Sequence, residues 1–178
     1  MHTPKSMLMT DSTKFYEVIP GLLYAGECPW VMPLESSHMN DLLELGIRDF
    51  ITLRDDVNST QISAITHALH SDISVLQFPI RDFSVPEHTL LEQIVDILGE
   101  HITSHRITYV SCAKGLGRTG LVIGCFLADY YRISNVQALK LMNELRLHCN
   151  FQIEYDSPET QEQINFVMNR NTEYLHDI

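Results

Sequence analysis

Hydrophobic residues recur along this chain at two alternating spacings. Short runs have one at every second position, which is typical of strands, and longer stretches have one at every third or fourth position, which is typical of helices. Strands are predicted over residues 15–19, 22–25, 47–53, 73–78 and 106–110. Helices are predicted from Ser36 or Ser37 to Gly46 and over residues 61–69, 86–102, 118–132, 134–147 and 158–174. This alternation predicts an α/β sandwich, with helices flanking a mostly parallel central sheet and the strand before Cys112 in the middle.

The composition is that of a single folded domain. A chain of 178 residues with 44% hydrophobic and 20% charged residues can build one hydrophobic core. Residues 1–13 lack the basic-then-apolar pattern of a signal peptide, so we expect a loose tail there and one domain over residues 14–178. No apolar run approaches the length of a membrane span. We expect a monomer that needs no cofactor.

The net charge narrows the choice of partners. It is −11 at pH 7 with neutral histidines, and such an acidic surface repels the phosphates of nucleic acids and of anionic membranes. We therefore expect no nucleic-acid partner and no simple electrostatic docking on a membrane.

The most informative segment is Ser-Cys-Ala-Lys-Gly-Leu-Gly-Arg-Thr-Gly at residues 111–120, between a predicted strand and the apolar stretch 121–128. A glycine-rich loop in that position can turn several backbone N–H groups towards an anion, and the following helix N-terminus adds partial positive charge. Cys112 and Arg118 then bracket the anion with a nucleophile and a bidentate cation. The loop lacks the Gly-Lys-Ser/Thr triplet of a Walker motif, and no second strand follows to carry the acidic residue of a dinucleotide site.

The loop resembles the Cys-x5-Arg-Thr/Ser phosphate-binding loop of the protein tyrosine phosphatase superfamily, in its small, dual-specificity and kinase-associated-like branch, bacterial members included. Three other segments are similar to this family, and the resemblance runs from about residue 15 to residue 170. They are the opening strand at Leu22–Pro29, the general-acid loop at Phe78–Pro86 and the glutamine segment at Ser157–Gln163.

The resemblance implies a phosphatase that forms a phosphocysteine intermediate. In-line transfer of a phosphoryl group spreads charge over three oxygens, and the loop N–H groups with the planar guanidinium suit those oxygens. The residues expected to bind substrate are Ala113, Lys114, Gly115, Leu116, Gly117 and Arg118. Loop dipoles, the helix N-terminus and Arg118 all stabilise a Cys112 thiolate. Thr119 can donate a hydroxyl hydrogen bond to that sulfur, which in the family helps the thiolate leave.

Asp82 is the candidate general acid, because it follows the strand that ends in Phe78-Pro79-Ile80 and matches the family's acid loop. Asp55 and Asp56 lie in a different strand-to-helix loop, and we interpret them as structural or substrate-facing residues. Arg54 is a candidate for the same rim of the site.

Gln161 and Gln163 match the glutamines that position the hydrolytic water in larger relatives, although a polar helix face also explains them. The sequence departs from the family at two positions. Ser111 stands where the family usually has a histidine that buttresses the loop, and Lys114 stands where relatives commonly have a small residue.

Cysteine and histidine spacings do not indicate a metal site. Two histidine pairs, His67 with His70 and His101 with His105, share helix faces, but no thiolate or Glu-x-x partner accompanies them, so we expect solvated surface histidines. A catalytic thiol needs a reducing compartment, which predicts a cytoplasmic protein without structural disulfides. Export to another compartment or to a host cell stays open.

The expected substrate is a phosphorylated protein, with phosphotyrosine first and phosphoserine or phosphothreonine left open. Two alternatives remain. A phosphoinositide or inositol-phosphate phosphatase is favoured by Lys114, and a phosphate-binding pseudophosphatase is favoured by Ser111. A rhodanese-like sulfurtransferase also uses a cysteine loop, but has no use for the Asp82 loop or for the Gly-Arg-Thr-Gly ending.

Overall fold

The computed structural model describes residues 13–30, 37–69 and 72–171, and in it five strands form one sheet in the order β1-β2-β5-β3-β4. The strands are β1 (Phe15–Ile19), β2 (Leu23–Glu27), β3 (Asp49–Arg54), β4 (Ser74–Ile80) and β5 (Thr108–Cys112). β1 pairs antiparallel with β2, and every other neighbouring pair is parallel. The predicted mostly parallel sheet is confirmed, with the strand that ends at Cys112 in its centre.

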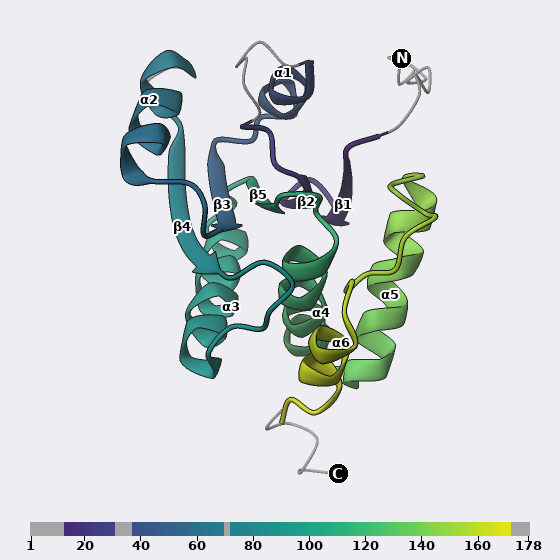
Figure 1. The fold of residues 1–178 in the computed structure, drawn as a ribbon. Coiled ribbons are helices and arrows are strands. Elements are labelled where there is room, and N and C mark those ends of the chain that lie inside the picture. Colours follow the sequence, from purple (N-terminus) through teal and green to yellow (C-terminus); the bar gives the residue numbers. More distant parts are fainter. Residues whose placement is uncertain (1–12, 31–36, 70–71, 172–178) are drawn as a thin grey trace, which may run out of the picture.

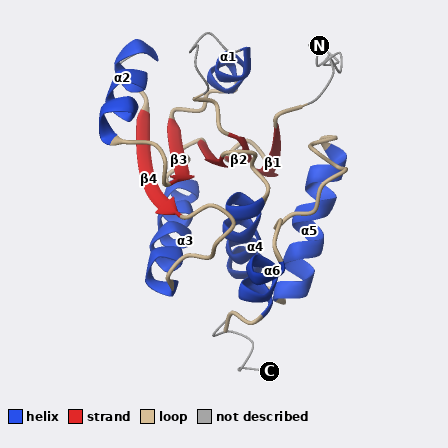
Figure 2. Ribbon diagram, viewed as in Figure 1, coloured by secondary structure: helices blue, strands red, loops and turns tan. Residues whose placement is uncertain are grey.

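Helices cover both faces of the sheet (Figures 1 and 2). They are α1 (Ser37–Glu44), α2 (Ser59–Leu69), α3 (His88–Thr103), α4 (Gly117–Tyr131), α5 (Asn135–His148) and α6 (Gln161–Met168). α1 and α2 lie on one side, and α3 to α6 lie on the other. The predicted α/β sandwich is confirmed.

Each face of the sheet has its own hydrophobic core. On one side Trp30, Met39 and Leu42 pack against Phe50 and Tyr109 of the sheet. On the other side the core is built around α4, where every residue from Gly117 to Ala128 is buried. Because the sheet, α3, α5 and α6 surround α4, residues 121–128 of this helix are an unbroken apolar run without an exposed polar face. This burial fixes the start of α4, where the predicted anion loop ends.

The last helix is shorter than the predicted span of residues 158–174. α6 begins after Thr160, whose side chain accepts from the backbone N–H of Gln163 in a capping box, and it ends at Met168. Two residues later, Arg170 turns inwards and pairs with Glu92 of α3 at 3.0 Å and with Asp129 of α4 at 2.6 Å. These ion pairs hold Arg170 against α3 and α4 just after the helix ends. Their partners are distant in the sequence, so the local hydrophobic pattern does not indicate where α6 ends.

Three further expectations concern single segments. His101 is 5% exposed and its Nδ1 lies 2.9 Å from the hydroxyl of Thr108, so the prediction of a solvated surface residue is wrong there, because its helix face packs against β5. The tail predicted over residues 1–13 lies outside the described residues except for Thr13, and His70 also lies outside them. None of the described helices is long and apolar enough to cross a membrane.

Candidate active site

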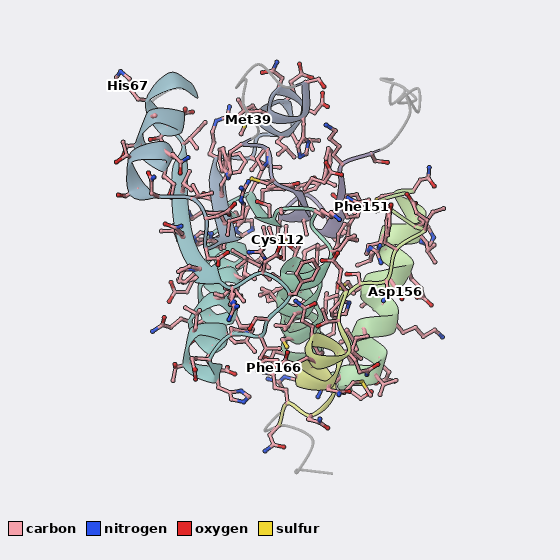
Figure 3. All side chains as sticks on the ribbon, viewed as in Figure 1. Met39, His67, Cys112, Phe151, Asp156 and Phe166 are labelled. Carbon is pink, nitrogen blue, oxygen red and sulfur yellow. The ribbon has the colours of Figure 1, made fainter. Side chains whose placement is uncertain are left out.

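Cys112 is the last residue of the central strand β5, and the loop 113–116 connects it to α4. Figure 3 shows it near the middle of the molecule, between the sheet and α4. Its side chain is buried, with 2% of the residue exposed, whereas Ala113 and Lys114 are exposed on the loop. A reagent must therefore enter the curl of the loop to reach the sulfur.

The loop curls because Gly115 adopts φ +74°, in the left-handed region that favours glycine. A Cβ atom at Gly115 would also lie within 3 Å of the backbone of Gly26 in β2. The loop therefore rests directly on the neighbouring strand. The Cys28 N–H, just past the end of that strand, donates to the Ala113 carbonyl at 3.1 Å.

Two further loop carbonyls are bound from the C-terminal part of the chain. Gln152 Nε2 donates to the Lys114 carbonyl at 2.9 Å, and Ser157 Oγ donates to the Leu116 carbonyl at 2.8 Å. In a planar trans peptide, the N–H of the next residue points opposite to the carbonyl. The N–H groups of residues 114, 115 and 117 therefore point away from these outer partners, into the curl, as an anion site requires.

Arg118, in the first turn of α4, is the residue that joins the loop to the neighbouring strands. Its side chain is 3% exposed. Nη1 donates to the Ile80 carbonyl at 2.9 Å and to Asp55 at 3.2 Å, and Nη2 lies 2.9 Å from Asp82. The buried Nε has no hydrogen-bond partner among the described residues. Leaving such a donor unpaired costs about 1–3 kcal/mol, and an anion oxygen in the loop is a partner of suitable chemistry.

Asp82 lies in the loop after β4, with its side chain 55% exposed and one oxygen on Arg118. The same side chain accepts from the Phe83 N–H at 3.1 Å, and the Ser84 N–H donates to the Arg81 carbonyl at 3.1 Å. Phe83 has φ +58° and is 56% exposed. The candidate general acid is thus placed beside Arg118 by a tight turn.

The two other acidic candidates, Asp55 and Asp56, have different partners. Asp55 reaches Arg118, as a residue facing the site would, whereas Asp56 pairs with Arg54 at 2.6 Å. Arg54 also donates to the Cys28 sulfur at 3.4 Å. The hydrogen bonds from Arg54 lower the pKa of Asp56, and those with Asp56 raise the pKa of Arg54. Burial raises the pKa of the Cys28 thiol, although Arg54 partly offsets this effect.

The remaining predicted residues are placed in different surroundings. Thr119 is fully buried, and its hydroxyl has no hydrogen-bond partner among the described residues, so the expected bond to the Cys112 sulfur is not formed here. Gln163 is fully buried and Gln161 is exposed, where it donates to Asn165 at 2.9 Å. Ser111 is 1% exposed in β5, paired with Gly26 and Thr52. The catalytic roles assigned to these residues stay predictions.

Sequence reasoning missed the loop supports Gln152 and Ser157. Ser157 begins the segment that resembles the family, but nothing local marks its hydroxyl as a partner of the loop. The glycine at position 120 is only a weak indication that another segment packs closely there: a Cβ at Gly120 would overlap the Ser157 hydroxyl. Within the described residues, no group of three His, Cys, Asp or Glu side chains is arranged to hold a metal ion.

Solved structures with a similar fold include phosphatases. Tk-PTP in its active form aligns with a TM-score of 0.66 at 20% identity, over 89% of this chain and 98% of that one. PTPMT1 in complex with PI(5)P aligns with a TM-score of 0.64 at 15% identity, over 88% and 93%. The fold is therefore that of the protein tyrosine phosphatase superfamily, as the sequence predicts.

The family itself follows from the sequence match. The model of the dual-specificity-type phosphatase family of polymorphic toxin systems (Tc-R-P, DSP-PTPase) matches residues 27–130, and the chain belongs to this family. An uncharacterised protein of Methanocaldococcus jannaschii is 34% identical over 104 residues, which cover 58% of this chain and 60% of that protein. The match thus spans little more than half of each protein.

Proposed function

We propose that this chain hydrolyses phosphate monoesters through a phosphocysteine intermediate, with protein phosphotyrosine as the preferred substrate. The observation that carries the proposal is the contact of Arg118 with Asp82 at 2.9 Å, at the end of the loop that starts at the buried Cys112. A nucleophile, a phosphate-binding guanidinium and a proton donor are the three groups that this reaction needs.

The proposed reaction has two steps. In the first, the Cys112 thiolate forms a bond to phosphorus while the ester P–O bond breaks, and Asp82 gives its proton to the leaving oxygen. In the second, water attacks the phosphocysteine and gives a proton to Asp82, and phosphate and thiolate are released. The loop N–H groups and Arg118 hold the charge on the three phosphoryl oxygens in both steps. The buried Thr119 hydroxyl would find a partner in the thiolate as it leaves.

The proposed preference for phosphotyrosine rests on the burial of Cys112 and on the exposed aromatic ring beside Asp82. Because Cys112 is 2% exposed, a phosphoryl group at the end of a long aryl side chain reaches it more easily than one on a short serine side chain. Phe83 is 56% exposed directly after Asp82, and an aromatic ring there suits an aryl ester. Phosphoserine and phosphothreonine are weaker candidates on the same grounds.

A second candidate substrate is a phosphoinositide or an inositol phosphate. Lys114 is exposed on the phosphate-binding loop, where its charge would favour a substrate with a further negative group. The PTPMT1 neighbour is described in complex with PI(5)P. The net charge of −11 opposes approach to an anionic membrane, so this candidate ranks second.

The test is a panel of phosphotyrosine peptides, phosphoserine peptides and phosphoinositides, assayed by phosphate release with wild type and Cys112→Ser. We expect turnover highest on phosphotyrosine and lost in Cys112→Ser, because a serine hydroxyl is a poor substitute for a thiolate. Cys149→Ser, at a half-buried cysteine outside the phosphate-binding loop in the sequence, is the control and should keep activity. Phosphate binding without turnover by wild type across pH 5–8 would instead support a pseudophosphatase.

A further inference from the structure

The side chain of Gln163 connects helix α6 to the loop that carries the candidate acid Asp82. Gln163 is the third residue of α6 and is fully buried. Its Oε1 accepts from the Thr160 N–H at 3.2 Å, and its Nε2 donates to the Ser84 carbonyl at 3.1 Å. Ser84 lies 79 residues earlier in the chain, two residues after Asp82. In Figure 1 the loop between β4 and α3 passes across α4 and approaches α6.

Gln163 also lies against the first residue of α4. A Cβ atom built on Gly117 would be 3.0 Å from Oε1 and 3.1 Å from Nε2 of Gln163, so the missing side chain of Gly117 makes room for the amide. The same amide group therefore touches the start of the helix that carries Arg118 and the loop that carries Asp82. It is placed to set the distance between them.

The acid loop depends on such an anchor, because its own contacts are few. Asp82 is more than half exposed, and its side chain contacts Arg118 and the Phe83 N–H. The turn is closed from Ser84 to Arg81, so the carbonyl that Gln163 binds belongs to the residue that closes the turn. A ring stack of His88 on Phe166, with centroids 4.9 Å apart, fixes the start of α3 to the same face of α6.

We propose that Gln163 is a positioning residue that holds the Asp82 loop over the phosphate-binding loop through the Ser84 carbonyl. This inference rests on the proposed phosphatase function. It differs from the water-positioning role that the sequence predicts for Gln163. Both polar atoms of the amide already have protein partners and the residue is fully buried, so the amide is better placed to fix the acid than to hold a water molecule.

The sharpest variant is Gln163→Glu, because a glutamate at this position keeps the capping bond to Thr160 but loses the donor to Ser84. We expect kcat/KM for phenyl phosphate to fall about tenfold more than kcat/KM for 4-nitrophenyl phosphate, since the poorer leaving group depends more on a well-placed proton donor. In an Asp82→Asn background the same change should add no further selective loss. Gln163→Met, which introduces no charge, should give the same leaving-group pattern.

Gln137→Glu is the matched control. Gln137 has the same place in the capping box of α5, with Ser134 as its partner, and it is exposed. It should leave both rates unchanged. Iodoacetate labelling of Cys112 at one pH should be equal in Gln163→Met, which adds no charge near the sulfur, and in wild type, which shows that the phosphate-binding loop is intact.

Two results overturn the inference while leaving the proposed function standing. One is an equal loss on both esters. The other is a burst of the nitrophenol product followed by slow turnover, which places the defect in hydrolysis of the phosphocysteine and supports the water-positioning role. A wild-type protein without turnover on either ester overturns the proposed function and this inference with it.

Discussion

Replacing Asp82 by asparagine should lower kcat/KM for phenyl phosphate by about 10²–10⁴-fold, because the leaving phenoxide loses its proton donor. That loss corresponds to about 2.7–5.5 kcal/mol of activation free energy. Asparagine keeps the shape of the side chain, and its Oδ1 can still accept from the Phe83 N–H. The change therefore removes the proton and the charge with little disturbance of the turn.

The structure supplies a control for the charge. Asp55 lies 3.2 Å from Arg118 and Asp82 lies 2.9 Å from it, with side chains 41% and 55% exposed. Coulomb energy varies inversely with distance, so the two attractions differ by about a tenth before solvent screening, which acts on both. With Asp82 ionised, Asp55→Asn and Asp82→Asn therefore remove nearly the same electrostatic support from Arg118, and with Asp82 protonated, as proton donation requires, Asp82→Asn removes less of it. The excess loss in Asp82→Asn measures proton donation.

The assay follows kcat/KM against pH for phenyl phosphate and 4-nitrophenyl phosphate in the three proteins. Asp82→Asn should lose the basic limb of the profile and should be impaired more on the phenyl ester. Asp55→Asn should keep the limb and affect both esters alike. Equal losses in the two variants, or a leaving-group effect in Asp55→Asn alone, would refute the assignment of Asp82.

Two further predictions concern stability and are read from urea unfolding. Arg170→Met should cost about 2–3 kcal/mol, since it removes a largely buried guanidinium that pairs with Glu92 and Asp129. Lys140→Met, at an exposed pair of 3.8 Å, should cost less than about 0.5 kcal/mol, and equal costs would contradict this reasoning. Burial lowers the pKa of His101 in the folded state, so the unfolded chain binds more protons, and stability should fall as pH drops through about 6.5, by up to about 1.4 kcal/mol per pH unit. His101→Gln should flatten the pH 5–6.5 part of this curve, and an unchanged slope would show that His101 titrates alike in both states.

The phosphate-binding loop is predictable from sequence because its determinants are consecutive. The glycines, Cys112 and Arg118 stand within ten residues, and strand, loop and helix follow each other without interruption. The place of Asp82 follows from a similar local rule, since it comes directly after a strand that lies near β5 in a parallel sheet. The acidic residue after the neighbouring strand, Asp55, reaches Arg118 by the same rule.

The supports of the site are not predictable in this way. Gln152 binds a carbonyl 38 residues away, and Ser157 binds one 41 residues away. Such bonds depend on how α5 and α6 pack, and a polar residue in a loop has many possible partners. The end of α6 is not predictable for the same reason, because the ion pairs of Arg170 just after it reach α3 and α4.

The groups proposed to react and the groups that hold them are encoded in separate stretches of the chain. Asp82, Cys112 and Arg118 lie between residues 82 and 118, whereas three side chains that anchor their loops lie between residues 152 and 163. Substitutions between residues 152 and 163 can change the shape of the opening above Cys112 or the reaction rate without altering any reacting group. Natural variation in rate or substrate choice can therefore accumulate there while the chemistry stays constant.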